Sequence, residues 1–544
     1  MELDLYRWRK QTGPLKRKAK PGVKKKALFC NLLSSVAGAK AEALYAHFLA
    51  QRGYAVTVVL RGPNRITERI FSSVLGVEFV YLDTYTKRLD DADIEHQART
   101  IIEQGSTVQK LLDLTVDKVR IGKNSLSWVA RQLRAGSINL TDPEHRSLVD
   151  ETIKKSIIAF RASQVIVSEI KPDLALFLER GYTPAGELFD ICIASGVNTI
   201  QWLGAPQSGT FLFKRYNSTN QVYHPLALDP VSWQKIKEMD WSQERDDLLM
   251  DKLQSHYKSG AWFNRQQLQE NKTIKTQNEI VSQMGLDPSK KIAVIFTHIL
   301  YDATFFYGES LFADYAEWLT ETVREAIANP NLNWLIKVHP VNVWRSAADG
   351  VPMEQLEATL LHDTFGVLPD HVKIIPADTD INTYSLFEII DYGLTVRGTV
   401  GIELPCYGIP AVTAGTGRYS GNGFTVNPKT VKEYRLILAH LHLRGSLTDG
   451  EINLARRYAF GSFFLRPKKI DFFNFDFHAN DYNQPLFAAN TYVRKADGDA
   501  KDMNAIADWM VNNNELDLLD WDAFLNEVPM KKTPNNNKLL VSRS

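Results

Sequence analysis

The sequence has few cysteines, and nothing in their arrangement indicates a bridge or a metal centre. Cys30, Cys192 and Cys406 are the only three among 544 residues, and each lies far from the others in an apolar stretch. Zinc sites need closely spaced ligands, whereas isolated cysteines in apolar stretches are typical of buried thiols in a reducing compartment. We therefore predict no disulfide, no metal site and no bound cofactor.

Long apolar runs and an excess of charge are also absent. No stretch approaches the roughly 20 apolar residues that span a bilayer, and the N-terminus lacks the apolar segment of a signal peptide. Lysine and arginine number 64 and aspartate and glutamate 63, so the formal net charge is +1 and no overall field favours nucleic acid. These features predict a cytoplasmic protein without a nucleic-acid partner.

The N-terminal arm, residues 1–25, is nevertheless strongly basic. Only Glu2 and Asp4 oppose its lysines and arginines, which are Arg7, Arg9, Lys10, Lys16, Arg17, Lys18, Lys20, Lys24 and Lys25. Two interpretations are open. The arm is either poorly ordered in solvent or attracted to the anionic inner face of the cytoplasmic membrane, where each basic residue contributes about 1 kcal/mol.

What the sequence does contain is an alternation of apolar strands and helices in two regions. The apolar content of 44% and the charged content of 23% are typical of a soluble globular protein, and 544 residues exceed one ordinary core. Alternation of this kind builds parallel sheets. We predict an α/β protein with Rossmann-like domains at 26–215, with a helical insertion, and at 286–445. A helical connection at 216–285 joins them, and a helical extension and tail follow at 446–544.

The stretch 391–421, DYGLTVRGTVGIELPCYGIPAVTAGTGRYSG, predicts a strand, a tight turn, a helix and a second strand. In a parallel α/β sheet this turn lies at the carboxyl edge, where the free N–H groups of the helix favour an anion. Gly398 allows a phosphate to approach the backbone, and Arg397 adds positive charge. Glu403 lies one helical turn past Thr399, within reach of a sugar hydroxyl. The stretch therefore predicts a nucleotide-phosphate site.

Two earlier strands of the second domain end in basic side chains. KIAVIF, at 291–296, precedes Thr297 and His298, and WLIKVHP, at 334–340, carries Lys337 and His339 at its end. Strand alternation places Lys337 and His339 on the same face, where they are suited to stabilise a phosphate leaving group. For His298 a second interpretation is open, in which it caps the neighbouring helix.

Charged residues also follow the strands of the first domain. Glu179 comes directly after the predicted strand DLALFL, at 173–178, and a carboxylate there beside apolar side chains is suited to take a proton from a hydroxyl. The alternatives for Glu179 are a salt bridge to Arg180 or a helix cap. Lys214 and Arg215 follow a glycine-bearing loop, and they either meet an anionic group of the substrate or face water.

The motifs LIKVHP, at 335–340, and RGTVGIELPCYGIPAVTAG, at 397–415, resemble those of bacterial capsule polysaccharide biosynthesis proteins. Those proteins are glycosyltransferases of the two-Rossmann GT-B fold, related to capsule Kdo transferases and more remotely to bacterial sialyltransferases with a His-Pro motif. The resemblance implies that His339 contacts the donor phosphate, that Arg397, Gly398 and Thr399 line the phosphate site, and that Glu403 holds the ribose. It also implies an acidic catalytic base in the first domain, to which Glu179 is the nearest match.

The resulting prediction is an inverting, metal-independent GT-B glycosyltransferase. The first domain is expected to bind a surface polysaccharide or glycolipid acceptor and the second a nucleotide sugar such as CMP-Kdo, across a cleft. Glu179 and His339 are the predicted catalytic residues, and the predicted donor-binding residues are His298, Lys337, Arg397, Gly398, Thr399 and Glu403. Three alternatives are open: a polyol phosphotransferase of the teichoic acid type, a non-catalytic nucleotide-sugar-binding scaffold and a sugar epimerase.

Overall fold

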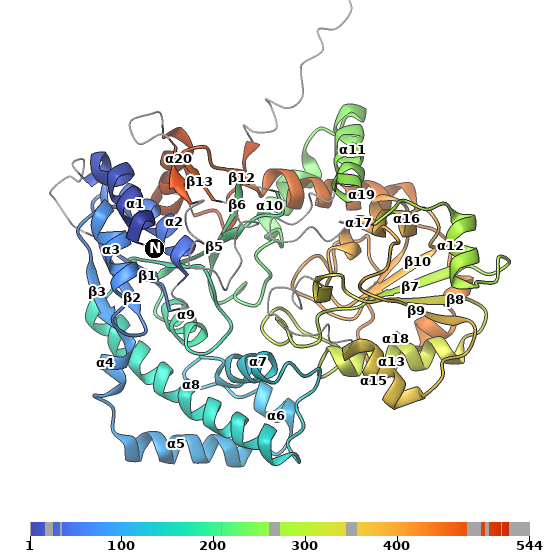
Figure 1. The fold of residues 1–544 in the computed structure, drawn as a ribbon, viewed down its shortest axis with the longest axis horizontal. Helices are drawn as coiled ribbons and strands as arrows, with labels where there is room; N and C mark the ends of the chain where they lie inside the picture. The colour runs from blue at the N-terminus through green and yellow to red at the C-terminus, as the bar shows by residue number, and fades with distance from the viewer. Residues whose placement is uncertain are drawn as a thin grey trace, which may run out of the picture.

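Figure 1 shows two α/β lobes, one built from the first part of the chain and one from the later part. The structure is a computed structural model that describes residues 2–16, 25–32, 35–207, 209–259, 272–343, 356–475, 491–494, 500–512 and 514–521. No helix within these ranges has both the length and the apolar character needed to cross a membrane.

The N-terminal lobe contains a sheet with the strand order β12-β6-β5-β4-β1-β2-β3. Strands β3, β2, β1, β4 and β5 are parallel, whereas β6 and β12 are antiparallel to their neighbours. The bounds are β1 Lys25–Cys30, β2 Tyr54–Leu60, β3 Glu78–Tyr81, β4 Leu174–Phe177, β5 Asn198–Gly204, β6 Thr210–Tyr216 and β12 Lys468–Lys469. The predicted alternation of strands and helices therefore builds a parallel sheet here.

Both faces of this sheet are covered by helices, which explains why its strands read as continuous apolar runs. Ala27 and Phe29 of β1 face one apolar cluster, and Leu28 and Cys30 face the other. The helices of the first cluster are α1 Glu2–Lys16, α2 Val36–Ala50, α3 Arg65–Val74 and α20 Lys501–Asn512. Those of the second are α5 Asp91–Gln104, α6 Val108–Leu112, α7 Ile121–Leu133, α8 Pro143–Ile170 and α9 Ala185–Ala194, with the short α4 Leu82–Thr86 beside α8.

The interpretation of the N-terminal arm as poorly ordered is wrong for its first part. Residues 2–16 form helix α1, which packs on α3 and buries Leu5 and Trp8 to 1% exposure. The indole of Trp8 donates to the carbonyl of Ile70 at 3.2 Å, and the carboxylate of Asp4 pairs with Lys40 at 2.8 Å. The apolar residues spaced along one face of the helix outweigh the basic charge on its other face. Lys25 begins β1, and residues 17–24 of the arm lie outside the described residues.

The C-terminal lobe contains a parallel sheet with the strand order β11-β10-β7-β8-β9. Its strands are β7 Ile292–Phe296, β8 Asn333–Lys337, β9 Val372–Ile375, β10 Tyr392–Thr395 and β11 Ala411–Thr413. Its helices are α12 Gln277–Met284, α13 Tyr315–Ala328, α15 Leu356–Phe365, α16 Thr383–Phe387, α17 Val400–Cys406 and α18 Val431–Ala439. The chain runs outward from β7 to β9 and then returns to the other side of β7 with β10, so a topological switch point lies between β7 and β10.

The end of the chain crosses back to the N-terminal lobe. Helix α19 Asp449–Phe460 and the π-helix Gly461–Leu465 pack against α10 Pro230–Glu238 and α11 Gln243–Ser259, after which β12 joins β6. A short ribbon of β13 Phe473–Asn474 and β14 Tyr492–Val493 follows. The C-terminal segment therefore completes the sheet of the first domain.

Neither open interpretation of Lys214 and Arg215 was correct, because both residues lie in the buried strand β6. The Lys214 ammonium pairs with Asp517 at 2.6 Å, and Arg466 pairs with the same carboxylate at 2.9 Å; all three side chains are fully buried. Arg215 donates to the side chain of Asn198 at 2.7 Å and to backbone carbonyls near the C-terminus. These cations therefore anchor the returning chain and contact neither substrate nor bulk water.

Removing the Asp517 carboxylate should destabilise the protein strongly. Asp517→Ala leaves Lys214 and Arg466 as uncompensated charges in the core, so the free energy of unfolding should fall by about 3–5 kcal/mol. Denaturant unfolding followed by circular dichroism measures this. Asp508→Ala is the control, because Asp508 pairs with Arg52 but is 56% exposed, and its loss should change the free energy by at most about 1 kcal/mol. Equal effects would contradict this assignment.

Candidate active site

A cavity of about 130 Å³ lies at the carboxyl ends of β7, β8 and β10, next to the switch point of the C-terminal sheet. Polar side chains from several loops line it. Five of the predicted residues are among them: His298, Lys337, His339, Gly398 and Thr399. Open α/β sheets bind ligands in this position, so the cavity is the candidate substrate site.

The turn after β10 forms one wall of the cavity, and it requires glycine at position 398. The Gly398 N–H donates to the hydroxyl of Thr395 at 3.0 Å. A β-carbon at 398 would lie only 2.9 Å from that hydroxyl oxygen. Helix α17, which follows the turn, has seven residues with Pro405 inside it, so the cavity depends on its side chains for anion binding more than on a helix dipole.

His298 holds this turn in place. Its Nε2 accepts the N–H groups of Val396 at 3.2 Å and Arg397 at 3.3 Å, and lies 3.0 Å from the Thr395 hydroxyl. Burial, together with the positive charge of Arg397, holds the pKa of His298 well below its ordinary value. The ring is therefore neutral with its hydrogen on Nδ1, and it stacks on Tyr315 with centroids 4.4 Å apart. The predicted donor-binding residue thus shapes the site by positioning the backbone.

Lys337 and His339 both line the cavity, on the same side of β8. Lys337 is 3% exposed, and its ammonium lies 3.3 Å from the carbonyl of Val338. Burial, with a contribution from the charge of Lys272, lowers the pKa of Lys337 to about 7. The Nδ1 of His339 accepts the N–H of Val341 at 3.2 Å, which places the hydrogen of the neutral ring on Nε2. The two side chains are therefore suited to donate to an anion.

Arg397 was predicted to line the phosphate site, but it is not among the residues that line the cavity. Its guanidinium is 4% exposed and is absent from the cavity wall. It donates to the hydroxyl of Ser310 and to the carbonyl of Glu309 at 3.4 Å, on the loop that follows β7. Its Nε and Nη1 have no hydrogen-bond partner among the described residues. Arg418, which was not predicted as a site residue, donates to the backbone carbonyl of Arg397 at 3.2 Å.

Glu403 lies behind the cavity wall in contact with a residue that the sequence analysis missed. The hydroxyl of Tyr257, which lines the cavity, donates to one oxygen of this fully buried carboxyl. The other oxygen has no partner among the described residues, and burial raises the pKa of Glu403. The two residues are 146 positions apart, so no local pattern indicates their contact. The Tyr257 hydroxyl thus occupies one of the two oxygens that Glu403 was predicted to offer to a ribose hydroxyl.

Glu179 lies in the N-terminal lobe, in a loop that meets the C-terminal lobe. It is half-buried after β4 and borders a small cavity of about 10 Å³. Tyr182 lies further along the same loop, and its hydroxyl donates to Asp302 at 3.1 Å. Arg180 is fully buried and donates to the side chain of Gln201 at 2.9 Å and to two backbone carbonyls. The loop carrying Glu179 therefore contacts the loop that follows β7.

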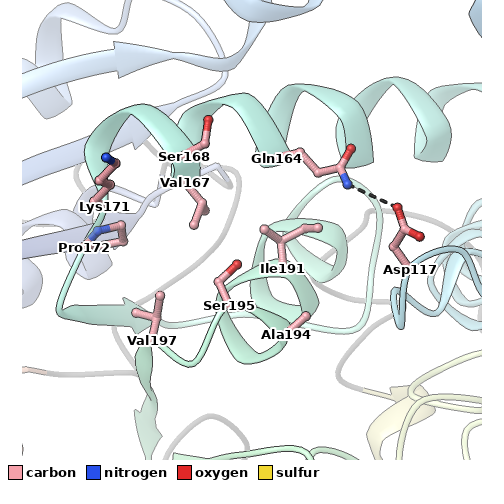
Figure 2. Close-up of a pocket in the computed structure, with 10 residues that line it drawn as sticks. All are labelled: Asp117, Gln164, Val167, Ser168, Lys171, Pro172, Ile191, Ala194, Ser195 and Val197. Atoms are coloured by element: carbon pink, nitrogen blue, oxygen red, sulfur yellow. Dashed lines mark hydrogen bonds between the residues drawn. The ribbon is translucent and has the colours of Figure 1, made fainter.

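A second hollow, of about 620 Å³, lies in the N-terminal lobe away from all the predicted site residues. Figure 2 shows its wall, which the end of α8 and the end of α9 provide. Gln164 donates to Asp117 at 3.3 Å across one side, and Lys171 and Pro172 border the other. Because Pro172 comes just before β4 and Val197 just before β5, whereas Glu179 follows β4, the hollow lies at the opposite edge of the sheet from Glu179.

Metal ligation was not expected at this site. Among the residues that the structure describes, no group of three or more histidine, cysteine, aspartate or glutamate side chains is arranged to hold a metal ion.

The two Rossmann-like lobes define an α/β protein of the GT-B class, as predicted. Solved structures similar to it include a β-Kdo 2,4-transferase, KpsC, of Thermosulfurimonas dismutans, at 14% identity and TM-score 0.33, over 62% of this chain and 87% of the other. The UDP-GlcNAc 2-epimerase of Neisseria meningitidis is 11% identical at TM-score 0.27, over 80% and 96% of the two chains.

A third similar structure is that of Anabaena HepE in complex with UDP-glucose, at 13% identity and TM-score 0.26, over 81% of this chain and 96% of the other. No protein-family model and no curated protein matches the sequence. At these identities and TM-scores, the likenesses do not assign an activity to this chain.

A methyl group at position 398 should disturb the turn that walls the cavity. In Gly398→Ala the β-carbon meets the Thr395 hydroxyl, so we expect a loss of about 1–3 kcal/mol in the free energy of unfolding. Gly450→Ala is the matched control, because a β-carbon there meets nothing within 4 Å. Thermal unfolding of both variants measures the difference. A Gly398→Ala protein as stable as the control would contradict this account of the turn.

Proposed function

We propose that the protein is a glycosyltransferase that moves a sugar from a nucleotide donor to a polysaccharide or glycolipid acceptor, with inversion and without a metal. One observation carries this proposal. Lys337 and His339 lie at the end of β8 and the turn at Gly398 follows β10, yet they line one cavity at the switch point of the sheet. Such a set of donors suits a phosphate on which negative charge develops.

The size of the cavity limits what it holds. At about 130 Å³ it is smaller than the roughly 300–1,000 Å³ of pockets that enclose a whole ligand. The phosphate of the donor fits, whereas its nucleoside and sugar must extend beyond the cavity. Thr297, Thr383, Thr395 and Thr399 add hydroxyl groups around the phosphate position. The resemblance of the sequence motifs to capsule enzymes favours a CMP-linked sugar such as CMP-Kdo.

The reaction then needs a base on the acceptor side. Glu179 takes the proton of the acceptor hydroxyl, whose oxygen forms the new bond to the anomeric carbon. The bond from that carbon to the phosphate oxygen breaks, and its electron pair leaves with the phosphate. Lys337 and His339 stabilise the resulting charge through N–H donors. Attack from the side opposite the phosphate inverts the anomeric configuration.

Helix α1 supports a location at a membrane surface. Leu3 and Tyr6 are 62% and 64% exposed, and Arg7 and Lys10 lie on the same face of the helix at spacings of three and four residues. A face that combines apolar and basic side chains suits the anionic inner surface of a bilayer. The protein would then act as a peripheral enzyme in the cytoplasm, next to a lipid-linked acceptor.

Replacing His339 tests the catalytic role directly. His339→Ala should lower kcat by about 10²–10³-fold, because the variant loses a donor to the leaving phosphate while the fold remains. Mass spectrometry of the product with a panel of nucleotide sugars measures transfer, and it separates a glycoside from a phosphate-linked product or an isomerised donor. His440→Ala, on the exposed end of α18, is the control and should retain activity. Full activity in His339→Ala would rule out the role.

Donor binding should depend on pH through Lys337. Its pKa of about 7 lies far below the ordinary value, and a bound phosphate favours the charged form and raises the pKa again. Affinity for CMP should therefore fall above about pH 7, by up to tenfold per pH unit, where the nucleotide phosphate is already ionised. Calorimetric titration between about pH 7 and pH 9 measures this.

Two variants test whether Lys337 causes this pH dependence. Lys337→Arg keeps its charge at every pH used and should give an affinity that changes little with pH. Lys373→Arg, on the neighbouring strand β9, is the control and should behave as the wild type. A wild-type affinity that stays constant over this range would contradict the assignment of Lys337.

A further inference from the structure

A second carboxyl group is buried beside Glu179 in the N-terminal lobe. Glu42, on α2, is 0% exposed. Its Oε2 accepts from the Asn31 side-chain amide at 2.7 Å, and its Oε1 accepts from the Trp202 indole at 3.2 Å. No lysine, arginine or histidine pairs with it among the described residues. A carboxylate buried without a cation is expensive to ionise, so this group is held in its neutral form.

The groups around Glu42 are also consistent with a neutral, protonated carboxyl. Burial raises its pKa to about 8, although the donors Asn31 and Trp202 oppose the shift. The titratable groups that face it are Cys30 on β1 and Tyr45 on α2, and burial with the charge of Glu42 raises the pKa of both. At neutral pH the carboxyl of Glu42 therefore carries a hydrogen that needs an acceptor.

Asn31 can supply that acceptor. Its Oδ1 is buried and has no partner among the described residues, while its Nδ2 faces Glu42. The two ends of an amide are nearly the same size, and rotating the group exchanges them. In the rotated state Oδ1 accepts the hydrogen of neutral Glu42, and the Trp202 indole still donates to the other oxygen. After this rotation, the N–H groups of the Asn31 amide point away from Glu42, toward the position that Oδ1 occupies in the structure.

Asn31 also borders the small cavity that touches Glu179. The cavity measures about 10 Å³, and its wall includes Asn31, Ser35, Glu42, Leu178 and Glu179. A volume of this order holds about one water molecule. Asn31 and Glu179 therefore border one cavity with room for about one water molecule.

We propose that Glu42 is a positioning residue that decides which end of the Asn31 amide faces the catalytic base. When Glu42 is neutral, Asn31 presents N–H groups that stabilise the ionised form of Glu179. When Glu42 is ionised, Asn31 presents its carbonyl oxygen, so the ionised carboxylate of Glu179 loses that hydrogen-bond donor. The base is therefore held in position only while Glu42 keeps its proton. This inference rests on the proposed transferase function, with Glu179 as the base.

The pH dependence of kcat tests the proposal. At saturating donor, which removes the effect of Lys337 on binding, wild-type kcat should fall along an alkaline limb with a midpoint near pH 8. Glu42→Gln copies the neutral acid, because its amide donates to Asn31 Oδ1 and its oxygen accepts from Trp202. This variant should stay active and lose the alkaline limb. Asn31→Ala should lower kcat and move the acidic limb to higher pH, since the base loses its donor.

Glu68→Gln is the control, because Glu68 accepts from the Tyr81 hydroxyl at 3.0 Å in the same lobe without contacting the cavity near Glu179. It should keep the wild-type profile. An alkaline limb that is unchanged in Glu42→Gln would overturn the proposal.

A measurement independent of activity separates this inference from the proposed function. The ¹H–¹⁵N signal of the Trp202 indole, assigned by its loss in Trp202→Phe, should shift with pH around a midpoint near 8 and stay constant in Glu42→Gln. A constant wild-type signal would overturn the proposal. A shifting signal in a protein that transfers no sugar would overturn the transferase function and the link to Glu179, and would leave the titration of Glu42 established.

Discussion

The reversal of strand order in the C-terminal sheet is the constraint on which the candidate site depends. Strands β7, β8 and β10 are parallel neighbours, so their carboxyl ends meet at one edge although other strands and helices separate them along the chain. The polar residues that follow these strands are thereby brought together at one edge of the sheet. His298 then adds rigidity, because its neutral ring accepts the backbone N–H groups of the turn that completes the wall.

A second constraint joins the two ends of the chain. Asp517 lies between Lys214 and Arg466 in a fully buried cluster, and each residue comes from a different segment. Isolated charges at these positions would be very unfavourable, so the returning segment and the edge of the N-terminal sheet must form together. The returning segment therefore supports β6, which pairs with β5, the neighbour of the strand β4 that precedes Glu179.

Groups with perturbed ionisation gather next to the predicted substrate positions. Burial makes Glu42 and Glu403 harder to ionise and Lys337 easier to deprotonate. Each is close to a cavity wall that also carries a predicted site residue. Such clustering is typical of sites that bind or transfer charged groups, since the same burial that perturbs a side chain also strengthens its interaction with a ligand.

Much of the architecture followed from the sequence because buried parallel strands are continuous apolar runs. The strands that precede His298, His339 and Gly398 were predicted in this way, and their order along the chain indicated a common edge. Strand β6 was missed because Lys214 and Arg215 suggest an exposed segment, and only the distant partner Asp517 makes them compatible with burial. Helix α1 was missed because its basic residues concealed a buried apolar face.

The sequence by itself determined which segments become strands and which polar residues end them, because periodicity and turn residues are local properties. Only the tertiary structure decided what those polar residues do. It turned Arg397 toward Ser310, placed Tyr257 on Glu403, and set Asn31 and Glu42 together on the wall of the cavity that Glu179 borders. Such contacts depend on burial and on partners far away in the chain, and no local pattern records them.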